Sequence, residues 1–144
     1  MTDLKNNSSA FGLIFLCWLI ATTATVGSLF FSEVMEFLPC MLCWYQRIFM
    51  YPLVLIFLCG LLPLDRGVFK FSLPLVVGGL VSALYHNLLH WGIIPESATP
   101  CRSGVSCSAV WIDWGGFITI PLLSLLAFSL LLILLIIFYR RFIR

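Results

Sequence analysis

The feature that most constrains the fold is a series of four long apolar runs that are nearly free of charge. The run from Phe11 to Phe31 contains 21 residues and no charged side chain. At 1.5 Å per residue, such a helix crosses a hydrocarbon core about 30 Å thick. A helix also satisfies its own backbone hydrogen bonds in lipid. We therefore predict an all-α integral membrane four-helix bundle, one domain over 1–144, with spans at about 11–31, 43–62, 71–91 and 116–138.

The overall composition agrees with a membrane location. Hydrophobic residues make up 62% of the chain and charged residues 10%, whereas soluble domains carry about 25% charged residues. The net charge of +2 is small, and no basic stripe or base-stacking motif is present, which argues against nucleic-acid binding. Six cysteines are many for this length, but a disulfide-stapled secreted scaffold is polar and rich in loops. The cysteines therefore need another explanation.

The first apolar run has a competing interpretation as a cleaved signal peptide, because small residues occur between Ala24 and Ser28. Against it, the run exceeds the 7–15 residues of a usual signal-peptide core, and the preceding segment has almost no basic residues. We expect this run to be retained as the first span. In the third run, Gly78 and Gly79 predict a close approach of a neighbouring helix.

The basic residues predict the orientation in the membrane. With four spans, both termini and the turn near residue 65 share one side, and the positive-inside rule places that side in the cytoplasm. Cys40, Cys43, Cys101 and Cys107, which lie at or beyond run ends, then face outward, where disulfides persist. Six of the eight basic residues are on the predicted cytoplasmic side: Lys5, Arg66, Lys70, Arg140, Arg141 and Arg144.

Cys40 and Cys43 form a Cys-x-x-Cys motif at the start of the second run. A helix N-terminus favours a thiolate through its dipole and its unpaired N–H groups. Arg47 follows at i+7 from Cys40 and therefore lies on the same helix face. The second pair, Cys101 and Cys107, is separated by five residues. The two pairs are best interpreted as two dithiol/disulfide couples.

Two other interpretations of these cysteines remain open. The four residues could form a Cys₄ zinc site, although zinc motifs usually have two to four intervening residues and the first pair lies at a membrane boundary beside Arg47. They could also form structural disulfides only. We predict redox chemistry and no metal. Cys17 and Cys59 lie within apolar runs, and we expect them to act as small hydrophobic residues.

Arg47 needs an explanation because an arginine inside a span costs about 2.5–3.5 kcal/mol at the helix centre and less near the interface. Its side chain could simply extend to the surface. Alternatively, it faces a polar group bound in the membrane, and a quinone head group, with carbonyl oxygens that become negative on reduction, meets this description. We expect Gln46 to donate a hydrogen bond as well, and Trp44 and Tyr45 to form aromatic walls.

The third run places His86 and His90 near its outer end, four residues apart and on one face. Two such histidines cannot ligate opposite sides of one haem. Imidazole titrates near neutral pH, so His86 is a candidate for assisting proton uptake by the quinone. A hydrogen bond between helices is the alternative for His86, and the favoured one for His90.

The chain contains four distinctive motifs: Pro-Cys-x-x-Cys-x-x-Gln-Arg over 39–47, Tyr-His-x-x-Leu over 85–89, Pro-Cys-x₅-Cys over 100–107 and Gly-Phe-Ile-Thr-Ile-Pro over 116–121. Together they resemble the DsbB family of bacterial membrane disulfide-bond formation proteins. The spacing of the second cysteine pair is similar to that of the compact BdbC-type members. A departure is His90, where this resemblance leads us to expect glutamine.

The resemblance implies a function and a role for each site residue. Cys40 and Cys43 would be the couple next to the quinone, Cys101 and Cys107 the couple that reacts with a partner, and Arg47 the cation that contacts the quinone. The chain would be a protein-dithiol:quinone oxidoreductase of the bacterial inner membrane. It would reoxidise a DsbA-like protein of thioredoxin fold and pass electrons to ubiquinone or menaquinone.

Two rival functions remain at this point. A vitamin K epoxide reductase-like enzyme uses the same components on a four-helix bundle, with a different cysteine order and different loop lengths. A non-catalytic membrane protein with structural disulfides or a zinc site is the rival from another class.

Overall fold

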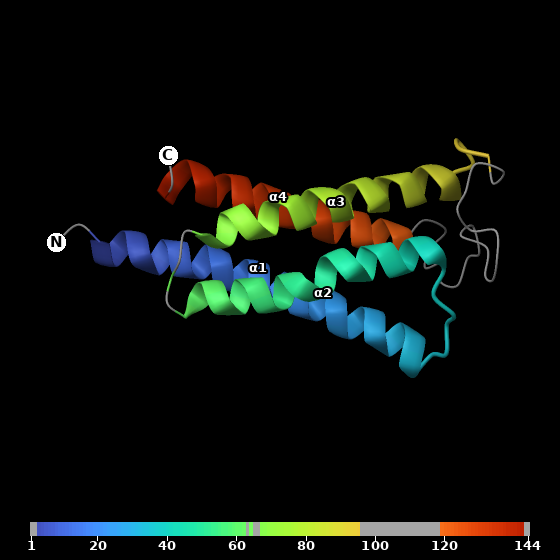
Figure 1. Ribbon diagram of the computed structural model, residues 1–144, viewed down its shortest axis with the longest axis horizontal. Coiled ribbons are helices and arrows are strands. Elements are labelled where there is room, and N and C mark those ends of the chain that lie inside the picture. Colours follow the sequence, from blue (N-terminus) through green and yellow to red (C-terminus); the bar gives the residue numbers. More distant parts are fainter. Residues whose placement is uncertain (1–2, 63, 65–66, 96–118, 143–144) are drawn as a thin grey trace.

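The structure is a computed structural model that describes residues 3–62, 64, 67–95 and 119–142. It contains four helices: α1 (Asp3–Glu33), α2 (Met41–Leu61), α3 (Gly67–His90) and α4 (Ile120–Phe142). They lie lengthwise in one bundle, with both chain termini at the same end (Figure 1). The prediction of an all-α four-helix bundle is confirmed, and the described ranges hold no strand beyond one isolated bridge between Leu61 and Leu64.

Each helix is long and apolar enough to cross a membrane. The candidate spans are Ser8–Glu33, Met41–Leu61, Gly67–His90 and Ile120–Phe142. The protein is therefore a multi-pass membrane protein. Most large side chains on the outer faces, such as Leu55 and Val81, are exposed, which suits contact with lipid rather than water.

The helices form a closed ring in which each packs against two neighbours. α1 contacts α2 and α4, and α3 contacts the same two helices. The core between them contains Phe57 and Phe128, which are fully buried. Gly79 allows this packing, because a Cβ atom there would collide with the Phe128 ring on α4. The expected close approach at the glycine pair is confirmed, since Gly78 likewise faces Phe49 of α2.

Proline lies inside two helices. Pro52 in α2 has no N–H for the hydrogen bond to the preceding turn, and α2 changes direction midway along its length in Figure 1. Pro74 lies inside α3 rather than in its first turn. The helix begins at Gly67, four residues before the start of the predicted third span at about residue 71.

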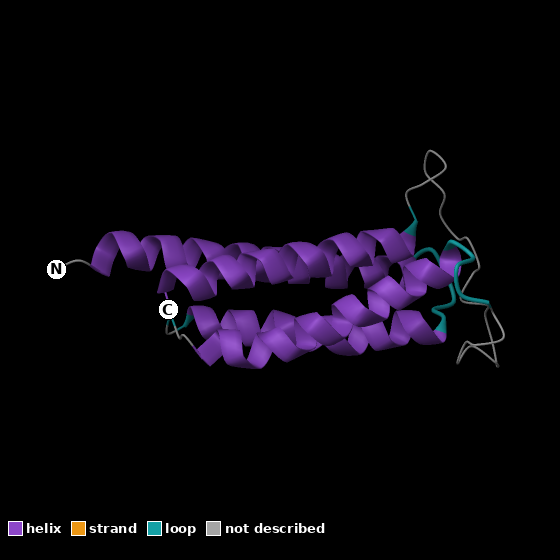
Figure 2. Ribbon diagram, turned by 90° about the horizontal axis from the view of Figure 1, so that it is seen from above, coloured by secondary structure: helices purple, strands orange, loops and turns teal. Residues whose placement is uncertain are grey.

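The end of the bundle opposite the termini carries the Cys-x-x-Cys motif, where α1 ends and α2 begins (Figure 1). Figure 2 shows described loop segments at this end of the bundle. There, Asn87 of α3 joins α3 to α4. Its side-chain Nδ2 donates to the carbonyl oxygens of Ala83 and Pro121, at 2.8 Å each. Buried polar bonds of this kind hold the helix ends in register next to the cysteines.

Candidate functional site

Cys40 is the N-cap residue of α2. The chain reverses direction after α1 with Glu36 at a positive φ of 55° and reaches Cys40 in an extended conformation. The Cys40 Sγ accepts a hydrogen bond from the backbone N–H of Cys43 at 3.3 Å. The sulfur thus occupies the place of a capping oxygen, where the helix dipole and free N–H groups stabilise a thiolate.

The two cysteines of the motif are in direct contact. Their Sγ atoms lie 2.8 Å apart, and both residues are free thiols. Cys40 lies just before the membrane-spanning segment. The hydrogen bond from Cys43 is the largest cause that lowers the pKa of Cys40 below its ordinary 9.0; burial opposes it, and contacts with His86 lower this pKa further. A lowered thiol pKa increases the thiolate fraction near neutral pH and makes the sulfur a better leaving group in disulfide exchange.

His86 and Gln46 form a buried pair behind Cys40. The His86 Nε2 lies 3.9 Å from the Cys40 Sγ, and its Nδ1 lies 3.1 Å from the side-chain nitrogen of Gln46. His86 comes from α3 and Gln46 from α2, and both are almost completely buried. A hydrogen bond between helices was one of the two sequence-based alternatives for His86. In the structure His86 contacts Gln46 of α2 and also the Cys40 sulfur.

Two thiols and an imidazole can also hold a metal ion, since the ligand atoms of Cys40, Cys43 and His86 lie within 4.8 Å of one another. Two thiolates on one tetrahedral zinc, with Zn–S bonds of about 2.3 Å, have sulfur atoms roughly 3.8 Å apart. The sulfurs here are closer, at 2.8 Å. This geometry suits a dithiol couple better than a metal centre.

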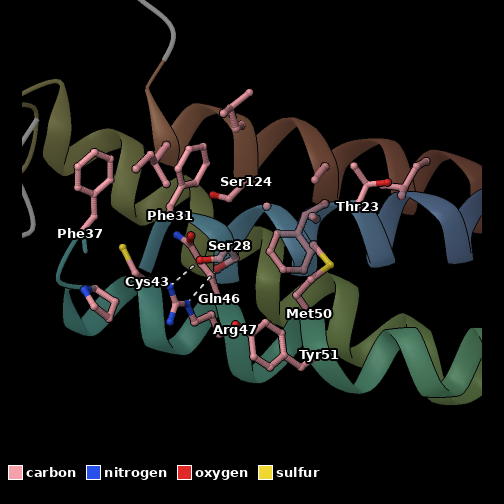
Figure 3. A pocket seen from close by; sticks show the side chains of 18 of the residues that line it. Thr23, Ser28, Phe31, Phe37, Cys43, Gln46, Arg47, Met50, Tyr51 and Ser124 are labelled. Carbon is pink, nitrogen blue, oxygen red and sulfur yellow. Dashed lines mark hydrogen bonds between the residues drawn. The ribbon is translucent and has the colours of Figure 1, made fainter. Parts of the chain in front are cut away.

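A cavity of about 460 Å³, whose wall includes Cys43, lies between α1, α2 and α4. Figure 3 shows Cys43 and Arg47 of α2 together with Ser28 and Phe31 of α1 around it. Phe31 stacks against Phe37 with ring centroids 6.4 Å apart. Most of the wall is apolar, and its polar side chains are Thr23, Ser28, Gln46, Arg47, Tyr51 and Ser124, with the Cys43 thiol.

Arg47 is held in the cavity wall by α1. Its Nε donates to the Ser28 hydroxyl oxygen at 2.9 Å, and one Nη donates to the Ser28 carbonyl oxygen at 3.1 Å. The guanidinium carbon lies 5.5 Å from the centroid of the Trp44 ring. A guanidinium has five N–H donors, so Ser28 leaves donors for a molecule in the cavity. Arg47 therefore does not merely extend to the surface.

The structure divides the sequence-predicted site residues into three groups. Cys43, Gln46 and Arg47 line the cavity, while Cys40 and His86 are absent from its described lining. Trp44 and Tyr45 are about half exposed and likewise absent from that lining; Trp44 instead flanks Arg47. The remaining pair, Cys101 and Cys107, lies outside the described residues.

Sequence reasoning missed the walls that α1 and α4 supply. Ser28, Phe31 and Ser124 line the cavity, but no local motif marks them. Ser28 belonged to a group of small residues that appeared relevant only to a signal peptide. Of the other two cysteines, Cys17 is buried as expected, whereas Cys59 is exposed on the outer face of α2.

Comparisons with known proteins agree with the resemblance in the motifs. Residues 10–138 match the family described as Disulfide bond formation protein DsbB. Disulfide bond formation protein C of Bacillus subtilis strain 168 is 46% identical over 120 residues, which cover 83% of this chain and 87% of the relative.

Two further relatives are named probable disulfide formation proteins. The protein from Metapseudomonas resinovorans is 43% identical over 130 residues, covering 90% of each chain. The protein from Deinococcus radiodurans is 43% identical over 130 residues, covering 85% of each chain. No solved structure matches the chain.

Proposed function

Because the chain belongs to the DsbB family of disulfide bond formation proteins, we propose that it is a protein-dithiol:quinone oxidoreductase that reoxidises a DsbA-like protein. Its relatives and its four candidate spans make it a disulfide-forming membrane protein with an oxidoreductase role. The proposal adds the electron acceptor, the partner and the residues that connect them. The observation that carries it is the placement of the Cys43 thiol and the Arg47 guanidinium in one largely apolar cavity.

The cavity fits a quinone in size and chemistry. Its volume of about 460 Å³ lies within the range of about 300–1,000 Å³ that is usual for small-molecule sites. Its apolar wall suits a flat, lipid-soluble ring, and Arg47 has unused N–H donors for a carbonyl oxygen. A bound quinone would supply a two-electron, two-proton acceptor. Ser28 fixes the guanidinium from a different helix, so the cation is oriented before anything binds.

Within the chain, we assign the two motif cysteines different tasks. Cys43 lies in the cavity wall and would be the sulfur nearest the acceptor. Cys40 lies at the membrane boundary and would undergo thiol–disulfide exchange with the second pair of this chain, Cys101 and Cys107. We propose that this second pair reacts with the partner protein. Each exchange proceeds by thiolate attack on a disulfide sulfur, so a lowered pKa at Cys40 assists it.

The direction of electron flow follows from the acceptor. For a two-electron couple, each increment of about 30 mV by which the potential of the quinone pool exceeds that of the dithiol couple is worth about 1.4 kcal/mol. A quinone pool that is kept oxidised therefore drives disulfide formation. For the orientation, we propose that the end carrying the termini faces the cytoplasm. Both termini lie at that end (Figure 1), and Lys70 near the start of α3 and Arg140 and Arg141 in the last turn of α4 belong to helix ends there.

The test is quinone reduction by purified protein that is supplied with a reduced thioredoxin-like donor. Turnover is expected with the natural sequence and is lost in Cys40→Ser. The matched control, Cys59→Ser, removes an exposed cysteine far along α2 and should retain turnover. Absence of turnover in the natural sequence, or full turnover in Cys40→Ser, would contradict the proposal.

A further inference from the structure

We propose that His86 is an acid–base residue for Cys40, and that Gln46 is the positioning residue that orients the imidazole. This proposal deepens the proposed function and rests on it for the overall reaction. It differs from the sequence-based expectation, in which His86 serves the quinone. The evidence is a buried Cys40–His86–Gln46 arrangement that joins the N-cap of α2 to α3.

The position of His86 relative to the cavity is the first argument. Its Nε2 lies 3.9 Å from the Cys40 Sγ, within the limit for a hydrogen bond to sulfur. Cys40 and His86 are absent from the described lining of the cavity, which Cys43 does line. The imidazole therefore approaches the sulfur that does not face the acceptor, and its direct influence is on Cys40.

The hydrogen bond to Gln46 is the second argument. Gln46 lies 3.1 Å from Nδ1, and this contact turns the other ring nitrogen toward Cys40. If the amide nitrogen donates to Nδ1, Nε2 carries the proton and donates it to a Cys40 thiolate. If the amide is turned over, its oxygen accepts from Nδ1, and Nε2 can accept the proton of the thiol. In both arrangements a proton is shared between Nε2 and the sulfur.

Burial strengthens the interaction. The exposed fractions are 6% for Cys40, 7% for Gln46 and 2% for His86. A hydrogen bond in such low-dielectric surroundings is electrostatically stronger than one in water. The described groups that act on the Cys40 ionisation are Cys43 of α2 and His86 of α3. The contacts with His86 contribute to the lowered pKa of Cys40. This is the arrangement by which a neighbouring imidazole activates a cysteine nucleophile.

The proposed role balances protons and electrons in the proposed reaction. Reduction of the Cys40–Cys43 disulfide by an incoming dithiol delivers two electrons and two protons. With the Gln46 amide oxygen accepting from Nδ1, one proton resides on the Cys43 thiol and the other on the His86 Nε2, which leaves Cys40 as a thiolate paired with an imidazolium. When the S–S bond forms again, the two electrons pass to a quinone, and the two protons released from Cys43 and His86 equal the two that formation of the quinol takes up.

The test measures the reactivity of Cys40 itself. The reduced full-length protein is treated with iodoacetamide from about pH 3 to pH 9, and the rate of alkylation at Cys40 is followed by mass spectrometry. With His86 present, the midpoint should lie well below 9. His86→Ala should move the midpoint upward, and at a pH below the midpoint each unit of that shift should slow alkylation about tenfold, because the thiolate fraction there changes about tenfold per pH unit.

The matched control is His90→Ala, one turn further along α3. The His90 Nδ1 is buried without a hydrogen-bond partner among the described residues, and its removal should leave the midpoint unchanged. Gln46→Ala should move the midpoint in the same direction as His86→Ala by a smaller amount, and it provides a second variant if His86→Ala does not fold. An unchanged midpoint in a folded His86→Ala or Gln46→Ala protein, or an equal shift in His90→Ala, overturns the proposal.

Steady-state kinetics separate this proposal from the alternative role at the quinone. If His86 serves Cys40, His86→Ala lowers kcat and leaves the KM for a soluble quinone unchanged. A raised KM with an unchanged alkylation midpoint would instead assign His86 to the quinone and overturn the inference. The alkylation experiment needs no turnover, so it remains decisive even if the natural sequence does not reduce quinone.

Discussion

Cys40 and Cys43 belong to one helix end, three residues apart, but their surroundings differ. Cys43 lies in the wall of an apolar cavity with Arg47, beside helices α1 and α4. Cys40 caps α2 and contacts His86 from α3. The N-cap position turns the first sulfur back over the helix end, where it accepts from the Cys43 N–H, and the first turn places the second cysteine in the cavity wall. A short motif can therefore present its two sulfurs to two different reaction partners.

This difference suggests how one dithiol can separate two reactions. The sulfur in the cavity is next to a fixed cation and an apolar wall, which suit a lipid-soluble acceptor. The capping sulfur lies outside the spanning segment and next to an imidazole, which suits exchange with other thiols. We call Cys43, Arg47 and the cavity the cavity side, and Cys40 with His86 the capping side. Each of the following predictions perturbs one of these two sides and states what is expected of it.

The largest expected effect comes from Cys43→Ser, which removes the sulfur on the cavity side. Without a second sulfur, the motif cannot form its disulfide, and quinone reduction should fall to background. Cys40 should still form a mixed disulfide with an activated thiol, because its contact with His86 does not depend on Cys43. Absorbance of the quinone and gel analysis of the mixed disulfide measure the two sides. Retained turnover would show that the motif is not the electron donor.

The next effect is expected from Arg47→Ala. Hydrogen bonds to charged groups contribute about 1.5–3 kcal/mol, so the KM for quinone should rise about 10- to 150-fold. Arg47→Lys keeps the charge but loses the planar array of donors, and it should give an intermediate KM. Alkylation of Cys40 should hardly change, since Arg47 lies on the cavity side. An unchanged KM in Arg47→Ala would remove the guanidinium from the quinone site.

A third prediction concerns the pH dependence of the capping side. The hydrogen bond from Cys43, and then the contacts with His86, lower the pKa of Cys40 below its ordinary 9.0 in the folded reduced protein. The unfolded chain therefore binds more protons between the two pKa values, and stability falls as pH decreases below 9. The disulfide form lacks this titration. The Tm of the reduced protein minus that of the oxidised protein should decrease between pH 8.5 and pH 5.5.

In this third experiment, His86→Ala should reduce the slope, and His90→Ala should not. A difference in Tm that is independent of pH would contradict a stabilised thiolate at Cys40.

The fold and the sequence-local part of the site were predictable because their signals are short in range. Hydrophobic length alone marks the four helices, and Cys-x-x-Cys with Arg47 on one face is a local pattern. The cavity was not predictable in the same way, because its other walls come from α1 and α4. Ser28 carries no motif, and its contact with Arg47 depends on how two helices pack.

The direction in which His86 points was also beyond the sequence. The i,i+4 spacing places His86 and His90 on one face of α3 but does not determine which helix that face meets. The rotation of α3 follows from its packing, in which Gly79 admits Phe128 of α4 and Asn87 donates to Pro121. Trp44, expected in the quinone site, is about half exposed and flanks Arg47.

The smallest expected effect is that of Ser28→Ala, which tests whether the cavity side depends on the orientation of its cation. The change removes the hydroxyl that accepts from Arg47 Nε, while the Ser28 carbonyl still accepts from an Nη group. Loss of one hydrogen bond worth about 0.5–1.5 kcal/mol should raise the KM for quinone about 2- to 12-fold.

Ser32→Ala is the matched control for Ser28→Ala. It removes a hydroxyl one turn later on α1 that bonds only to α1 itself, to the Ser28 and Leu29 carbonyls and to the Glu33 carboxylate, among the described residues. The KM should not change in this control. If Ser28→Ala alone raises KM, and Ser28→Ala adds nothing in an Arg47→Ala background, the serine acts through the guanidinium. An additive effect in that double variant would mean that the hydroxyl contacts the quinone directly, and the cavity would then bind its ligand through α1 as well as α2.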